Sequence, residues 1–492
     1  MSSAPTSAPS LSTAAPLWRS AAARPWLALL VAAVVLRLVT LPLMALTDHT
    51  EARYAEIARL MVQLGDWVSP HVTPTEVFWA KPPLSTWSQA LLMEVFGVNE
   101  WSGRLAALGW ALLGLWSLDW MLRASLAPSQ RAAALAALML CPMYFICAGA
   151  VMTDATLMAT ALLVQAAWWR AVTAPDAPAR RRAGRVLALG LGLALLTKGP
   201  AAGVLALLPP VLHALWRRHG KVVAAILKDP LAWLIWIGLA VPWYVWAEQR
   251  TPGFLQYFLL GEHVMRFLQP GWKGDRYGFA HAQPIGMIWL FVLVSALPWI
   301  VHAVVVRVAR GRSAKVASAT PAASAPERLG RELWVYALCI TAAPLLLFTA
   351  ARNIIPTYAV TALPGVVLLW LAQFDVPALA RARHWGTGVL VWGLMALGFA
   401  WLGPKESLRA SDRELIRAYE QACGPDAWTA RCALAYAGKP DHSAFFYSAG
   451  RLYSPPAGAA ARFQVLEKDT PTARARTDAL ACNKHLCLYA AP

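Results

Sequence analysis

Residues 48–83 carry the side chains best suited to chemistry, and they follow a long apolar segment. The stretch includes the carboxylate of Glu51 and the cations Arg53 and Lys81. A carboxylate can accept a proton, and a positioned cation can stabilise an anion as its charge develops. We therefore expect residues 47–102 to form an active-site loop.

An amphipathic helix is predicted over Glu51–Leu64, where apolar residues recur every three or four positions. Asp48 and Glu51 stand where a helix-capping pair would, and both are also candidate catalytic bases. The sequence leaves these two roles open. Tyr54, on the same segment, is a candidate contact to the substrate.

Three cations adjoin apolar segments. Two prolines follow Lys81 and fix the backbone there, whereas Lys198 and Arg352 lie in short loops on the side where basic residues are rare. Such cations are suited to binding a lipid-linked phosphate. The alternative for Lys81 is a lysine that extends to the membrane interface.

Residues 249–283 form a second large loop in which charged residues alternate with aromatic ones. Arg266 follows Glu262 and His263 by about one helical turn, so it can reach the same phosphate. Glu262 is a candidate substrate contact. A metal held by Glu262 and His263 is a weak prediction, because adjacent residues diverge on a helix.

Asp154 and Tyr358 complete the candidate set. Asp154 begins an apolar span, where an acid is either a helix cap or catalytic, and Tyr358 is either an interfacial anchor or a substrate contact. Carboxylates and cations beside lipid suit the transfer of a sugar from a polyprenyl phosphate, since the leaving phosphate gains charge. No phosphate-binding loop or dinucleotide fingerprint is present in the sequence.

The composition is that of a polytopic membrane protein. Of 492 residues, 58% are hydrophobic and 14% are charged. The net charge of +18 comes from short basic clusters between apolar spans, which follow the positive-inside rule rather than indicating nucleic-acid binding. We expect about 11–13 membrane helices. The clearest spans are predicted near residues 25–46, 103–122, 130–148, 153–171, 184–196, 200–216, 229–248, 284–307, 333–350, 355–374 and 385–403.

The basic clusters predict an orientation. A Ser-, Ala- and Pro-rich start, residues 1–16, is expected to be disordered and cytoplasmic, and the first span to be an uncleaved helix. Both large loops and the C-terminus then lie outside, so the predicted location is a bacterial inner membrane with the C-terminus in the periplasm.

The expected organisation is an all-α membrane domain, residues 1–403, followed by a small periplasmic α/β domain, residues 404–492. In the tail we predict a helix over 411–422 and short strands over 433–436, 444–447, 463–466 and 485–489. Its four cysteines predict two disulfides, most simply between neighbours in sequence, although three pairings are open. These cysteines are Cys423, Cys432, Cys482 and Cys487.

The ordered motifs resemble a known family. They read TEARYAEIARLMVQLGDWVSP, FWAKPPLSTW, MTDATL, LLTKGP, VPWYVWAEQRTPGFLQYFLLGEHVMRF and ARNIIPTYAVTALPG. In this order they are similar to the aminoarabinose transferases of lipid A, which are GT-C membrane glycosyltransferases related to the protein mannosyltransferases. The resemblance implies a periplasmic active site that moves a sugar from undecaprenyl phosphate to an acceptor with inversion at C1.

The resemblance also implies roles for single residues. It makes Arg53, Lys81, Lys198 and Arg266 phosphate-binding, and Arg352 is added to them from its position in the sequence. It further implies that Tyr358 contacts the donor, that Asp154 is a second acid of the site, and that His263 corresponds to a zinc-binding histidine.

Two departures from the family pattern affect the chemistry. Thr50 stands where the family has an aspartate, and Ala80 replaces the glutamate that accompanies the histidine on zinc. Since a hydroxyl is no base at neutral pH and alanine cannot bind metal, zinc is doubtful here. The candidate bases are therefore Glu51, Asp154 and Asp48.

The partners that we expect are a polyprenyl-phosphate sugar, lipid A or another envelope acceptor, and membrane lipids, with the protein a monomer and no nucleic acid bound. One alternative is a transporter or flippase of lipid-linked sugar, although few polar residues fall within the spans. Another is a non-catalytic relative that binds the donor, for which Thr50 and Ala80 are the reason.

Overall fold

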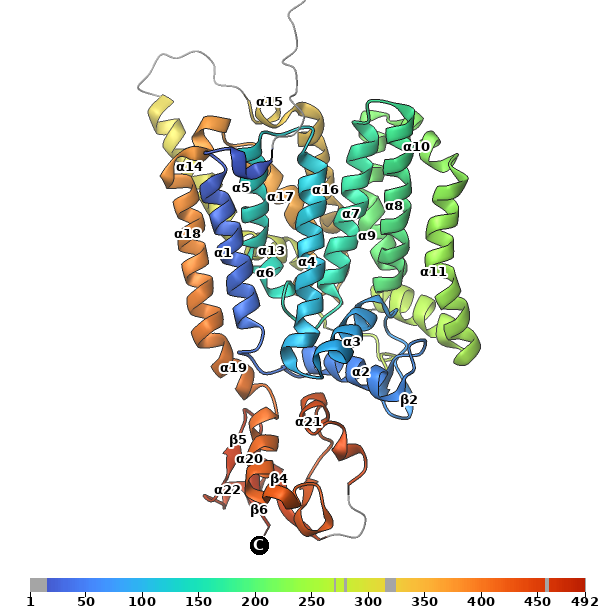
Figure 1. Ribbon diagram of the computed structural model, residues 1–492, viewed down its shortest axis with the longest axis vertical. Helices are drawn as coiled ribbons and strands as arrows, with labels where there is room; N and C mark the ends of the chain where they lie inside the picture. The colour runs from blue at the N-terminus through green and yellow to red at the C-terminus, as the bar shows by residue number, and fades with distance from the viewer. Residues whose placement is uncertain (1–15, 270, 278–280, 315–323, 456–459, 492) are drawn as a thin grey trace, which may run out of the picture.

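The structure, a computed structural model, describes residues 16–269, 271–277, 281–314, 324–455 and 460–491. Of the predicted disordered start, residues 1–15 lie outside this description. The described chain is mostly helical, and its long helices run side by side, with the C-terminal segment beyond one end of the bundle (Figure 1).

Each predicted span contains one helix or a pair separated by a break. Proline explains the break between α5 and α6, because Pro142 begins α6 and has no backbone N–H to continue α5. A second break bends α13 against α14 by 78°. The helices are α1 (Arg24–Thr40), α4 (Glu100–Leu122), α5 (Pro128–Met139), α6 (Pro142–Cys147), α7 (Asp154–Val172), α8 (Ala177–Lys198), α9 (Pro200–Arg217), α11 (Pro230–Arg250), α13 (Met287–Ser295), α14 (Leu297–Ala314), α16 (Arg331–Phe348), η3 (Pro356–Ala362), α17 (Leu363–Leu371) and α18 (Ala382–Leu397).

Several of these helices are long and apolar enough to cross a membrane. Within the described residues four satisfy both criteria alone, and the bent pair α13 and α14 would make a fifth. The four are Glu100–Leu122, Pro230–Arg250, Arg331–Phe348 and Ala382–Arg409. The chain is thus a multi-pass membrane protein, and the full number of spans stays a prediction.

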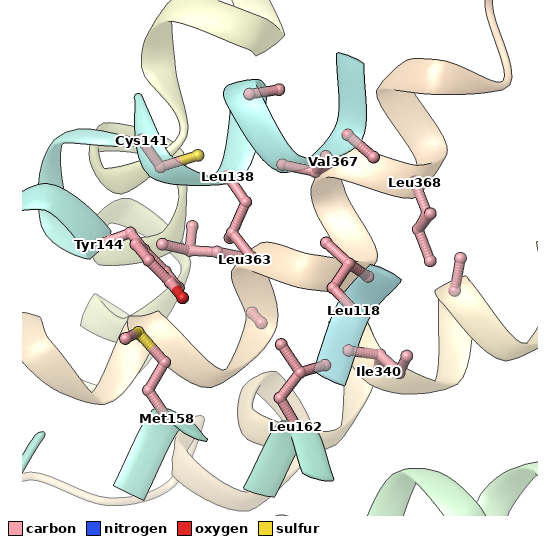
Figure 2. Packing of buried hydrophobic residues seen from close by; sticks show 14 of the residues in the cluster. Leu118, Leu138, Cys141, Tyr144, Met158, Leu162, Ile340, Leu363, Val367 and Leu368 are labelled. Carbon is pink, nitrogen blue, oxygen red and sulfur yellow. The ribbon is translucent and has the colours of Figure 1, made fainter. Parts of the chain in front are cut away.

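The core lies where α4, α5, α7, α16 and α17 meet. Leu118, Leu138, Leu162, Ile340 and Leu363 point toward one another there (Figure 2). The alanines of α5 are fully buried, so this helix lies close against its neighbours. Helix α7 packs on α4, α8 and η3, and these contacts hold its start, and with it Asp154, in place.

The first loop carries α2 (Glu51–Leu64), β1 (His71–Thr73), β2 (Glu76–Val77) and α3 (Leu84–Phe96). The predicted bounds of α2 are confirmed. The predicted capping pair is wrong, because α2 has no side-chain cap. The carboxylate of Asp48 accepts the backbone N–H of Ser443 instead, at 3.0 Å.

A mixed four-stranded sheet forms in the C-terminal segment, in the order β3-β4-β6-β5. Strand β4 pairs in parallel with β3 and antiparallel with β6. The strands are β3 (Ala433–Tyr436), β4 (Ala461–Glu467), β5 (Ala481–Cys482) and β6 (Leu486–Ala490), and α20 (Arg413–Cys423) packs against them. Both disulfides join neighbours in sequence, Cys423 to Cys432 and Cys482 to Cys487.

One strand predicted for this segment is wrong. Residues 444–447 belong to a helix, α21 (His442–Tyr447), which packs on α2. A four-residue apolar run does not distinguish a strand from one helical turn. The helix forms here because Ala444 and Phe446 are buried against neighbouring segments.

Candidate active site

A cavity of about 520 Å³ opens among α2, the loop before α3, the start of α7, the end of α8, η3 and α21. It combines cations, carboxylates and aromatic rings from segments far apart in the sequence. Its walls are formed by His49, Thr50, Arg53, Tyr54, Phe78, Ala80, Lys81, Thr153, Asp154, Lys198, Arg266, Asp275, Tyr277, His281, Asn353, Ile355, Tyr358 and His442.

Most of the residues predicted from sequence lie in this wall. They are Arg53, Tyr54, Lys81, Asp154, Lys198, Arg266 and Tyr358. Five predicted residues lie outside it: Asp48, Glu51, Glu262, His263 and Arg352. Four of the five predicted phosphate-binding cations therefore line the cavity, whereas only one of the three candidate bases does.

Lys198 and Asp154 form a buried ion pair at 2.8 Å. Asp154 is the first residue of α7 and Lys198 the last of α8, so the contact between these two helices brings the charges together. The Lys198 ammonium also lies 5.3 Å from the centre of the Tyr358 ring. This arrangement places a carboxylate, a cation and a phenol on one wall.

Glu262 joins two cations that reach it from different loops. Its carboxylate lies 3.0 Å from the Lys81 ammonium and 3.0 Å from the Arg266 guanidinium. Burial by itself would raise the pKa of Glu262, but Lys81 and Arg266 hold that pKa below its usual range. Asp275 also pairs with Arg266, at 3.2 Å.

Arg53 differs from the other three cations of the wall because no carboxylate pairs with it among the described residues. One of its terminal nitrogens donates to the Tyr277 carbonyl, and its Nε is buried without a hydrogen-bond partner. A buried, unsatisfied donor on a cation is costly without a ligand. Arg53 is therefore the cation most ready to accept an anion.

Glu51 faces away from the cavity and binds Arg104. The Arg104 guanidinium donates two hydrogen bonds to the Glu51 carboxylate, at 2.7 and 2.8 Å. Arg104 also donates to three backbone carbonyls after α1. Burial raises the pKa of Glu51, but Arg104 outweighs it and lowers the pKa overall. Among the three candidate bases, the geometry thus favours Asp154.

The residues around His263 do not fit a zinc site. Its Nδ1 lies 2.7 Å from the Phe258 carbonyl and its Nε2 lies 3.0 Å from the Lys198 carbonyl, so each nitrogen faces a backbone carbonyl. The neighbouring Glu262 is paired with two cations, and Ala80 offers no ligand.

Arg352 is displaced from the cavity, and its Nε lies 3.4 Å from the Gln283 carbonyl. The adjacent Asn353 lines the wall instead, and its amide donates to the carbonyls of Arg266 and Gln269 at 2.6 and 2.7 Å. Asn353 thereby fixes the end of the segment that carries Arg266.

Several wall residues were missed in the sequence, His442 above all. It comes from α21, in the C-terminal segment, where no site residue was predicted. Burial, together with the nearby Arg53 and His49, lowers the pKa of His442 to about 4, so the ring is neutral at pH 7. Its only sequence signal is a histidine at the start of a short apolar run.

Comparison with known proteins finds a matching family and a shared fold. The family described as dolichyl-phosphate-mannose-protein mannosyltransferase matches residues 23–258. A crystal structure of ArnT from Cupriavidus metallidurans bound to undecaprenyl phosphate superimposes with a TM-score of 0.71 at 21% identity, over 94% of this chain and 97% of that one. That likeness shows a shared fold.

Curated relatives are undecaprenyl phosphate-alpha-4-amino-4-deoxy-L-arabinose arabinosyl transferases. The protein of Erwinia tasmaniensis is 26% identical over 68% of this chain and 56% of its own length. That of Pseudomonas savastanoi pv. phaseolicola is 32% identical over 54% of this chain and 48% of its own. The chain thus spans about half the length of these curated relatives.

In its fold, in the family match over residues 23–258 and in its relatives, this chain is similar to the GT-C membrane glycosyltransferases. Among these it most resembles the proteins named ArnT or arabinosyl transferase.

Proposed function

We propose that the protein transfers a sugar from undecaprenyl phosphate to an acceptor in the bacterial envelope, with inversion at C1. The observation that carries the proposal is the cavity in which Arg53, Lys81, Lys198 and Arg266 converge beside Asp154. The names of the relatives favour aminoarabinose as the sugar. Lipid A is the acceptor that the resemblance of the sequence motifs implies.

The donor's phosphate binds first to Arg53, which lacks a carboxylate partner. Three carboxylates, Asp154, Glu262 and Asp275, balance the other three cations of the wall, so the site retains about one positive charge. As the bond from C1 to the phosphate oxygen breaks, negative charge grows on that oxygen. Lys81 and Arg266 stabilise this charge as their interaction shifts in part from the Glu262 carboxylate to the phosphate.

Asp154 accepts the proton of the acceptor's hydroxyl as that oxygen attacks C1. One C–O bond forms and one breaks, the electron pair of the broken bond stays with the phosphate, and the proton resides on Asp154 until water removes it. Before it accepts that proton, the Asp154 carboxylate is held in position by its ion pair with Lys198. Tyr358 and Tyr54 contact the donor beside the phosphate, and the neutral ring of His442 faces the acceptor.

We further propose that residues 1–403 form the transferase domain in the inner membrane, with the N-terminus cytoplasmic. Residues 404–492 then form a periplasmic domain, and the protein acts as a monomer. The two disulfides support this orientation, since disulfides persist in oxidising compartments. The contacts of α21 with α2, together with His442 in the cavity wall, support a role for this domain in covering the cavity.

The test is transfer of sugar from the lipid-linked donor in membranes that contain single variants. Lys81→Ala and Arg266→Ala are expected to abolish transfer while the protein remains folded. The matched control is Arg250→Ala, which removes an exposed arginine paired with Asp66 outside the cavity and leaves transfer unchanged. Full transfer by both cavity variants would exclude the proposed site.

A second function has one observation in its favour. Thr50 lies in the cavity wall where the resembling family has an aspartate, and this favours a protein that binds the donor without turning it over. Donor binding by the purified protein, with no transfer to any envelope acceptor supplied, would support that function and contradict ours.

A further inference from the structure

A second cavity, of about 420 Å³, lies at the opposite end of the helix bundle, and its described walls are almost wholly apolar. It is bounded by the first half of α8, the last half of α9, the start of α11 and the short helix α10 (Gly220–Leu227), which crosses this end (Figure 1). Nothing in the proposed transfer reaction uses it.

The walls of this cavity are fixed by contacts behind them. Trp168 of α7 forms the inner wall and donates its indole N–H to His213 Nδ1 at 3.1 Å. Ion pairs hold the helix ends, from Arg185 to Asp229 and from Arg217 to Glu332, both at 2.8 Å. The cavity is therefore preformed, and a ligand need not order it.

The cavity opens on the outer surface of the helix bundle. Val211, Leu215 and Leu227 line it and are 47%, 73% and 56% exposed, which is typical of side chains that face lipid. An acyl chain matches both the apolar walls and this opening. Burial of each methylene would contribute about 0.8 kcal/mol relative to water.

The rim of the cavity is cationic. Lys221 and Lys228 lie at the two ends of α10, and Arg218 lies just before it, all exposed. In the described part of the chain no carboxylate pairs with any of the three, whereas the neighbouring Arg185 and Arg217 are both paired. The uncompensated charge thus sits beside the opening that suits a lipid tail.

We propose that this cavity is a binding site for one anionic phospholipid of the membrane leaflet at this end. An acyl chain occupies the cavity between α8, α9 and α11, and Lys221 and Lys228 bind the phosphate of the headgroup. Charge complementarity chooses this occupant over a neutral lipid or another protein. The lipid fills the gap between α11 and the rest of the bundle at that end.

Native mass spectrometry of the full chain in detergent tests the proposal, with dioleoyl phosphatidylglycerol and dioleoyl phosphatidylcholine as probes. The first lipid molecule is expected to bind more tightly when it is phosphatidylglycerol than when it is phosphatidylcholine. The difference in affinity should be roughly fivefold for each of the two lysines. The variant Lys221→Gln/Lys228→Gln should lose this preference. A double control, Arg24→Gln/Arg381→Gln, removes two exposed arginines at the same end and should keep it.

A second pair of variants tests the acyl site itself. Val211→Trp fills the cavity and should abolish the first adduct, whereas Val204→Trp changes an equally exposed valine two turns away on the same face of α9 and should not. Equal affinity of the two lipids for the unaltered protein, or unchanged binding by Val211→Trp, would overturn the proposal. Neither readout depends on sugar transfer, so it stands or fails separately from the proposed reaction.

Discussion

Two buried carboxylates of this protein, both candidate bases, have different surroundings. Asp154 lines the cavity, and within the described residues its ion pair with Lys198 engages one oxygen and leaves the other available to a substrate. Glu51 instead uses both oxygens on Arg104, outside the cavity. Substitution of each by its amide separates a chemical role from a structural one.

Asp154→Asn should lower the turnover rate by about a hundredfold or more, because the amide accepts no proton. Binding of the lipid-linked donor should be retained, since the phosphate-binding cations remain. Single-turnover transfer and donor binding measured on the same preparation check this. A variant that turns over at the normal rate would remove Asp154 from the mechanism.

Glu51→Gln should lower the free energy of unfolding by about 3–5 kcal/mol, because the buried Arg104 loses its counter-ion. The midpoint of thermal unfolding in detergent measures this loss. Glu76→Gln, an exposed glutamate in the same loop, is the control and should unfold as the unaltered protein does. Equal midpoints for the two variants would contradict a structural role for Glu51.

At the scale of secondary-structure elements, the shape of the cavity depends on the contact between α2 and α21. Periodicity predicted α2 to the residue, because its apolar residues recur every three or four positions, but it did not reveal that Glu56 and Arg59 are buried as well. Helix α21 was predicted as a strand, and its contact with α2 was not foreseen, since nearly 400 residues separate Asp48 from Ser443. The local sequence pattern predicts single helices and strands, whereas a contact between residues so far apart in the sequence depends on the whole fold.

This contact should weaken as the pH rises. Burial raises the pKa of Asp48 to about 8, and the nearby Asp441 adds to that effect. The folded pKa lies above the unfolded value near 4, so the stabilising effect of protonation is complete below about pH 4 and is lost as pH approaches 8. The pKa of Asp412, raised to about 7 by burial, acts in the same direction.

Hydrogen exchange of the α21 amides, corrected for the intrinsic rate, measures this effect. Protection should fall between about pH 5 and pH 8 in the unaltered protein, and the fall should be smaller in Asp48→Asn, whose side chain carries no titrating proton. A pH-independent protection of α21 in the unaltered protein would exclude the explanation.

At the scale of the whole molecule, the cavity is assembled from both ends of the chain. The cations Arg53, Lys81, Lys198 and Arg266 were predictable because each stands in a motif or an unfavoured position. His49, Tyr277 and His442 were not, because only the packing of the loops and of the C-terminal segment against α2 brings them into the wall.

His442→Ala tests this assembly. Loss of one hydrogen bond to the acceptor should raise KM for the acceptor by roughly fivefold, with donor binding unchanged. His485→Ala removes an exposed histidine of the same C-terminal segment and should change neither. Steady-state transfer at varied acceptor concentration gives both values, and an unchanged KM in His442→Ala would place the acceptor elsewhere.

The ion pairs that hold three of the four wall cations also bear on how the proposed reaction would end. Once the sugar has left, the remaining lipid phosphate is more highly charged than the donor and would bind the cations strongly. Asp154, Glu262 and Asp275 stay within reach and compete for the same cations. They lower the affinity for the spent carrier, so the enzyme can release it and return to its starting state without recruiting ions from solution.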